Sequence, residues 1–146
     1  MKLRDELPAL TGATAWLNSR EIKKDELIGN KPVLIHFWSV SCDLCKRSIP
    51  RIQKLRNIYK DDLAVIAVHM PRSEKDLDMD LIKQTAAANK MTEPVFVDGE
   101  EKLTKAFANR QVPSFYLFDA GGSLRYLQKG SGNVQMLKNR LERLVK

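Results

Sequence analysis

The apolar residues of the chain fall into short continuous runs separated by longer amphipathic segments. The runs Pro32 to Trp38, Asp62 to Met70 and Glu93 to Gly99 have the length and composition of strands buried on both faces of a sheet. A fourth segment, Ser114 to Gly130, predicts a hairpin whose turn, Ala120 to Ser123, contains two adjacent glycines. These segments predict the strands of one sheet.

Segments of helical periodicity follow each of the first three strands and close the chain. In the second of them we expect one face to pack on the sheet. The residues of that face are Leu81, Ile82, Thr85, Ala86 and Asn89. The first predicted helix begins at Lys46. The other three cover residues 74–90, 101–109 and Asn133 to Lys146.

Two short elements are predicted in the N-terminal part. Residues 8–12 and 15–18 form a small β-hairpin, and residues 20–29 form a short helix that ends at Gly29. With the later elements, the order indicates an α/β sandwich with a mixed central sheet. Because no repeat, linker or low-complexity tract interrupts the chain, we expect one domain over residues 1–146.

Composition and charge exclude several classes of function. The chain carries a net charge of +7, but its 25 basic residues are interspersed with 18 acidic ones and form no block. This pattern favours a solvated basic surface over a nucleic-acid site. No apolar run has the roughly 20 residues of a membrane span, and Asp5 and Glu6 stand where a signal peptide would be apolar. We therefore expect a cytoplasmic protein with no membrane partner.

Both cysteines of the chain, Cys42 and Cys45, lie three positions apart at the junction between the first strand and its helix. Random placement gives this separation in roughly one arrangement in 74, so the pair indicates chemistry. N–H groups at a helix N-terminus stabilise an anion, and the thiol of Cys42 should ionise more easily than an ordinary thiol. We expect Cys42 to attack a disulfide and the more buried Cys45 to resolve the mixed disulfide.

The motif around the cysteines resembles the signature of the thioredoxin-fold family. It consists of FWSVSCDLCK, Pro50 in the following helix, and the step Val112-Pro113 in QVPSFYLFD. The resemblance implies that Cys42 and Cys45 are the redox pair, that Pro50 kinks the helix, and that Pro113 is a cis-proline beside the dithiol. It also implies that Val112 offers its backbone to an extended substrate.

The long stretch between Cys45 and Pro113 resembles the ResA and TlpA branch of this family. The resemblance implies an extra strand-helix insertion and an N-terminal β-hairpin in a thioredoxin-like α/β/α sandwich. Residues 68–78, VHMPRSEKDLD, resemble a soluble member of the branch. The implied function is a cytosolic thiol-disulfide oxidoreductase acting as a protein disulfide reductase.

Three residues depart from the family pattern. Ser41 replaces a tryptophan before the first cysteine, and Ser48 replaces a glutamate near the dithiol of the ResA branch. His36 stands where thioredoxin has a buried carboxylate used in proton transfer. Since a neutral imidazole accepts a proton near neutral pH, His36 is a candidate proton acceptor, and a neutral histidine buried in the sheet is the alternative. We expect Trp38 to flank the dithiol.

Other readings of the cysteine pair remain open. Two cysteines and the two histidines, His36 and His69, are the ligand set of a Cys2His2 zinc site, although their spacing does not fit one. A non-catalytic module could keep the fold and hold peptides at the Val112-Pro113 edge. The spacing does not fit a peroxidase of the peroxiredoxin type.

The redox reading defines the expected partners. They are disulfide-containing protein substrates and an electron-donating reductase or small thiol. The redox-active pair Cys42 and Cys45 works without a bound cofactor or metal, and we expect a monomer.

Overall fold

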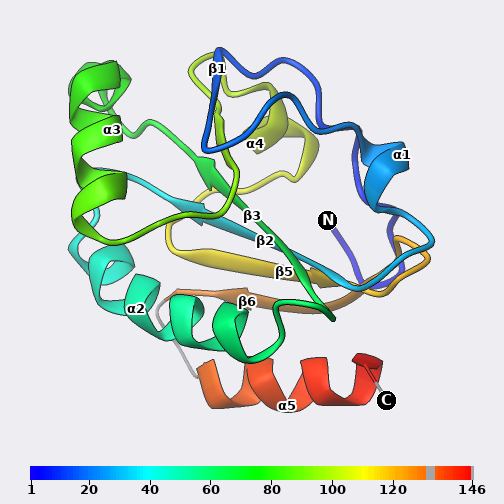
Figure 1. Cartoon of the computed structure of the whole chain (residues 1–146). Helices are drawn as coiled ribbons and strands as arrows, with labels where there is room; N and C mark the ends of the chain where they lie inside the picture. The colour runs from blue at the N-terminus through cyan, green and yellow to red at the C-terminus, as the bar shows by residue number, and fades with distance from the viewer. Residues whose placement is uncertain (131–133, 146) are drawn as a thin grey trace.

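A computed structural model describes residues 1–130 and 134–145 of the chain. All six named strands belong to one mixed sheet, and the helices pack on it in layers (Figure 1). The strands are β1 (Ala15–Leu17), β2 (Val33–Trp38), β3 (Ala64–His69), β4 (Val95–Val97), β5 (Ser114–Phe118) and β6 (Leu124–Lys129). The helices are α1 (Lys24–Leu27), α2 (Asp43–Ile58), the 3₁₀ helix η1 (Glu74–Leu77), α3 (Met79–Ala88), α4 (Lys102–Ala106) and α5 (Val134–Val145).

The strand order in the sheet is β1-β4-β3-β2-β5-β6. The pairs β2 with β3 and β3 with β4 are parallel, whereas β5 runs antiparallel to both β2 and β6. This is the mixed α/β sheet predicted from the order of the apolar runs. The central strands are buried on both faces, which is why their sequences are continuously apolar.

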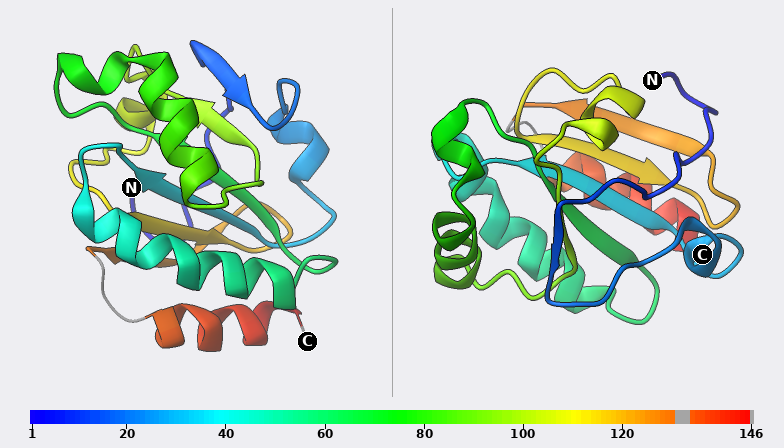
Figure 2. Two further views of the ribbon diagram at one scale, coloured as in Figure 1. Left: turned by 60° about the vertical axis from the view of Figure 1, so that its left-hand side comes forward. Right: turned by 90° about the horizontal axis from the view of Figure 1, so that it is seen from above.

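The two faces of the sheet have separate apolar cores. Leu34, Phe115 and Leu117 pack with residues of α2 and α5, which lie side by side (Figure 2). On the opposite face, the rings of Phe37 and Tyr116 meet Phe107, the residue after α4, at centroid distances of 5.2 and 4.9 Å. The alternation of side chains along β2 therefore sends Leu34 toward the helix that carries the cysteines.

The helix predicted over 74–90 is broken into two elements. The Asp78 side chain accepts hydrogen bonds from the N–H groups of Asp80 and Leu81 and so caps a new helix, α3, after η1. The cap sets the rotation of α3. Ile82 and Ala86 are buried as predicted, but Leu81 is 39% exposed, so the expectation that it packs on the sheet was wrong.

The predicted N-terminal hairpin is not present. Residues 15–17 form β1, but they pair antiparallel with β4, and residues 8–12 form no strand. The segment before them instead runs beside the start of β6, where Leu7 N–H donates to Gly122 O at 2.8 Å. Both contacts join positions far apart in the chain, so local periodicity does not report them.

The structure describes the predicted N-terminal helix in full and the predicted last helix without its terminal residues. The segment 20–29 contains α1, followed by Gly29 at a φ of +91°. The termini expected for the last helix, Asn133 and Lys146, lie outside the described residues. No helix in the described part of the chain is long and apolar enough to cross a membrane.

Candidate redox site

Cys42 and Cys45 form a disulfide at the junction between β2 and α2, and their Cα atoms are 5.3 Å apart. Cys42 is the N-cap of α2, and its Sγ accepts a hydrogen bond from the backbone N–H of Cys45 at 3.1 Å. The same N–H and the helix dipole stabilise a thiolate at this sulfur when the pair is reduced. The geometry therefore distinguishes the two sulfurs chemically.

The two cysteines differ only slightly in exposure in the disulfide form. Cys42 is 3% exposed and Cys45 is fully buried, in the order that the sequence led us to expect. The charged residues around them, Asp43, Lys46 and Arg47, are all exposed. Position in the helix therefore separates the roles of the two sulfurs better than burial does.

The peptide bond between Val112 and Pro113 is cis, as the family resemblance implied. Ser114, the residue after Pro113, pairs with Phe37 near the end of β2. The cis bond therefore lies beside the end of β2 that leads to Cys42. Val112 also packs in the same apolar cluster as Cys42 and Cys45. The fold thus brings the hydrophobic-Pro step to the dithiol end of the sheet.

Trp38 is fully buried in that same cluster at the end of β2. Its ring meets the His69 ring edge-on at a centroid distance of 5.0 Å. Its indole Nε1 has no hydrogen-bond partner among the described residues. Trp38 therefore belongs to the apolar core that also holds the cysteines.

His36 has a buried partner that the sequence did not reveal. Its Nε2 lies 2.9 Å from Oε2 of Glu93, the residue shortly before β4, and both side chains are at most 2% exposed. The Gln53 amide of α2 donates to both oxygens of Glu93 at 2.9 Å. Burial raises the pKa of Glu93, but the hydrogen bonds from His36 and Gln53 outweigh it and leave the pKa below its usual value.

His69, at the end of β3, accepts a hydrogen bond at Nε2 from the backbone N–H of Val40 in the loop before Cys42, at 3.3 Å. Burial lowers the pKa of His69 to about 4, although the charges of Asp76 and Asp98 act in the opposite direction. His69 is therefore neutral near pH 7 and helps to hold the cysteine loop.

We expect the protein to lose stability as the pH falls from about 6.5 to about 4. In this window the unfolded His69 binds a proton and the folded one does not, so protons favour the unfolded chain, by at most about 3 kcal/mol. Urea unfolding at several pH values measures this slope. In His69→Gln, whose side-chain oxygen can still accept from Val40, the slope should be shallower; equal slopes would contradict the assignment.

The described residues do not support the zinc reading. His36 is bonded to Glu93, His69 to Val40, and the cysteines to each other. In residues 1–130 and 134–145, no three His, Cys, Asp or Glu side chains gather as a metal site requires. The two cysteines and two histidines therefore do not come together as a zinc site in the described residues.

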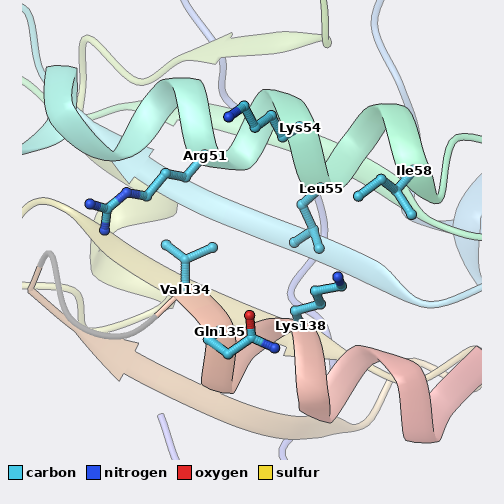
Figure 3. Close-up of a pocket in the computed structure, with 7 residues that line it drawn as sticks. All are labelled: Arg51, Lys54, Leu55, Ile58, Val134, Gln135 and Lys138. Atoms are coloured by element: carbon cyan, nitrogen blue, oxygen red, sulfur yellow. The ribbon is translucent and has the colours of Figure 1, made fainter.

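A groove of about 530 Å³ lies between α2 and α5, away from the cysteines (Figure 3). Its floor is apolar and its rim is basic, and neither cysteine nor histidine lines it. The lining residues are Arg51, Lys54, Leu55, Ile58, Val134, Gln135 and Lys138. The groove is thus separate from the dithiol.

Comparison with known proteins identifies relatives of the whole chain. The sequence profile of the AhpC/TSA family matches residues 3–127. The chain is 52% identical over 145 residues to thiol-disulfide oxidoreductase YkuV of Bacillus subtilis, covering 99% of this chain and 97% of that protein. It is 26% identical to sporulation thiol-disulfide oxidoreductase A of the same bacterium, covering 75% of this chain and 66% of that protein. It is 33% identical to DipZ of Mycobacterium bovis over 141 residues, which are only 20% of DipZ.

Solved structures agree with these relatives. The solution structure of a thioredoxin-like protein in the oxidised form has a TM-score of 0.90 and 52% identity, covering 99% of this chain and 97% of that one. The crystal structure of the thioredoxin-like superfamily protein SPOA0173 has a TM-score of 0.85 and 25% identity, covering 96% of each chain. The predicted thioredoxin-like fold and the predicted resemblance to a thiol-disulfide oxidoreductase of this family are confirmed.

Proposed function

The chain belongs to the AhpC/TSA family and is a thiol-disulfide oxidoreductase, and from this premise we propose that it reduces disulfides in protein substrates through Cys42 and Cys45. The hydrogen bond from the Cys45 N–H to the Cys42 sulfur carries this assignment, because it favours a thiolate at Cys42. Cys42 is then the attacking residue and Cys45 the resolving one.

The proposed reaction transfers two electrons to the substrate. The Cys42 thiolate attacks one sulfur of the substrate disulfide, that disulfide breaks, and its other sulfur leaves and takes up a proton. Cys45 then gives its proton to a base and attacks the Cys42 sulfur. The second substrate thiol is released, and the pair becomes the disulfide seen in the structure.

We propose His36 as the proton acceptor for Cys45. Its side chain alternates onto the same face of β2 as Leu34, which packs against the α2 side of the sheet. Glu93 would compensate the positive charge that His36 gains on accepting a proton. In this proposal Glu93 and Gln53 support the proton acceptor, and of the three residues only His36 was predicted from the sequence.

Trp38, Ser41, Val112 and Pro113 shape the proposed substrate surface around Cys42. Val112 would supply an apolar wall with the buried Trp38 behind it, and the cis Val112-Pro113 bond beside the end of β2 supports this proposal. An extended substrate segment beside this backbone would present its disulfide to Cys42. Ser41 stands next to the attacking residue.

The proposed setting is the cytoplasm, where the oxidised pair would be recycled by a reductase or a small thiol. The dithiol itself carries the two electrons, so the reaction needs no further cofactor. We propose that residues 1–146 act as one thioredoxin-like domain and as a monomer. Cell fractionation and sedimentation of the purified chain test location and assembly.

The reduction potential of the Cys42–Cys45 couple tests the direction of electron flow. We expect a value near that of thioredoxin, about −270 mV, as a cytoplasmic reductase requires. The protein is equilibrated in defined thiol-disulfide buffers, and its free thiols are alkylated and counted by mass. A value above about −180 mV would indicate an oxidant or an isomerase instead.

A further inference from the structure

Arg72, in the loop after β3, holds the residue that precedes the attacking cysteine. Its Nε donates to the hydroxyl of Ser41 at 3.1 Å, and its Nη2 donates to the carbonyl oxygen of Ser41 at 2.5 Å. Two nitrogens of the guanidinium group thus donate hydrogen bonds to the same exposed serine. Arg72 lies far from Ser41 in the sequence, and the thiol chemistry described above does not use it.

Asp76 of η1 hydrogen-bonds to both Ser41 and Arg72. One of its oxygens, Oδ2, accepts from the Ser41 hydroxyl and from the backbone N–H of Arg72, each at 2.8 Å. Asp76 is 1% exposed, and these two donors hold its carboxylate in place. Asp76 therefore ties the loop that carries Arg72 to the loop that carries the cysteine.

The carbonyl that Arg72 binds belongs to the peptide bond joining Ser41 to Cys42. The N–H of that same peptide donates to Ser39 O at 3.1 Å, so both polar groups of the peptide are bonded. Standard bond lengths put the Nη2 atom of Arg72 within about 8 Å of the Cys42 sulfur. A fixed positive charge at that distance favours a thiolate.

We propose that Arg72 and Asp76 are positioning residues for Cys42. They hold the Ser41–Cys42 peptide, and Arg72 places a fixed positive charge beside the attacking sulfur. This inference rests on the proposed function, because it assumes that Cys42 attacks as a thiolate. It adds a charge supplied from the loop after β3 to the helix N-terminus that already favours this thiolate.

Arg72→Met removes both the charge and the fork, whereas Arg72→Lys keeps the charge and loses the paired hydrogen bonds. Ser41→Ala keeps Arg72 and removes only the hydroxyl that it shares with Asp76. Lys75→Met is the matched control, since Lys75 is an exposed cation of η1 that makes no hydrogen bond to Ser41 among the described residues. The other charged or titratable groups around Cys42 are unchanged in the Arg72 variants and the control: Asp43, Lys46, Arg47, His69 and Asp76.

The measurement is the alkylation rate of Cys42 in the reduced protein across pH, followed by mass. In Arg72→Met the midpoint of this pH-rate profile should rise by about 0.5–1 pH unit. Arg72→Lys and Ser41→Ala should rise less, and Lys75→Met should match the unchanged protein. The reduction of dithiobis(nitrobenzoate) near neutral pH should slow in the same order.

A midpoint in Arg72→Met equal to that of Lys75→Met would overturn the inference. If Arg72→Met does not fold, an unshifted midpoint in Arg72→Lys and Ser41→Ala together has the same meaning. Failure of the proposed function is a different result: Cys42→Ser would then reduce dithiobis(nitrobenzoate) as fast as the unchanged protein. The two failures are therefore separable in one set of proteins.

Discussion

Cys42→Ser should lower the turnover of disulfide substrates by at least about 10³-fold. A serine hydroxyl at the N-terminus of α2 is not ionised near neutral pH, and the N–H of Cys45 that stabilises a thiolate cannot make it a comparable nucleophile. The loss is measured as the steady-state reduction of insulin disulfides with an excess of a recycling thiol.

Cys45→Ser should behave differently, because the first attack is still possible. The substrate becomes attached to Cys42, and no second thiol displaces it, so a mixed disulfide accumulates and is seen by mass. Leu44→Ala is the matched control: Leu44 is an exposed residue between the two cysteines, and its loss leaves both thiols in place. Full turnover in Cys42→Ser would contradict the assignment of Cys42 as the attacking residue, whereas no turnover in the unchanged protein would indicate a non-catalytic peptide-binding module.

The sequence predicted the parts of this fold whose signals are local. The central strands β2, β3 and β5 are buried on both faces, so their apolar runs are unbroken and easily recognised. Strand β1 pairs with β4, across most of the chain, and nothing in residues 8–18 indicates that partner. A hairpin was therefore predicted where the chain instead covers a distant sheet edge.

The same distinction holds for the candidate site. The spacing of Cys42 and Cys45 is a local signal, and the geometry found around them agrees with it. Glu93, by contrast, meets His36 across 57 positions, and Arg72 meets Ser41 across 31. A charged residue at the start of a buried apolar run, such as Glu93, is the one hint that the sequence offered, because a buried carboxylate requires a partner.

Removing the Glu93 side chain should destabilise the protein strongly, because Glu93 is fully buried. Glu93→Ala leaves His36 buried without its acceptor and takes the acceptor from the half-buried Gln53, and breaking a buried pair by deleting one partner costs about 3–5 kcal/mol. Glu93→Gln keeps a hydrogen-bonding oxygen and should cost only about 1 kcal/mol. Urea unfolding of the oxidised protein gives these differences, with the slope checked for a constant unfolding transition.

The double variant His36→Leu with Glu93→Leu separates pairing from packing. Replacing a buried pair by apolar side chains is often neutral, so the double variant should be more stable than Glu93→Ala. The same proteins test the proton acceptor, because a release step that depends on His36 slows in the double variant while the first attack by Cys42 does not. An unchanged pH-rate profile for release would exclude His36 as the base, whereas a stability loss below about 1 kcal/mol in Glu93→Ala would show that the buried pair contributes little to folding.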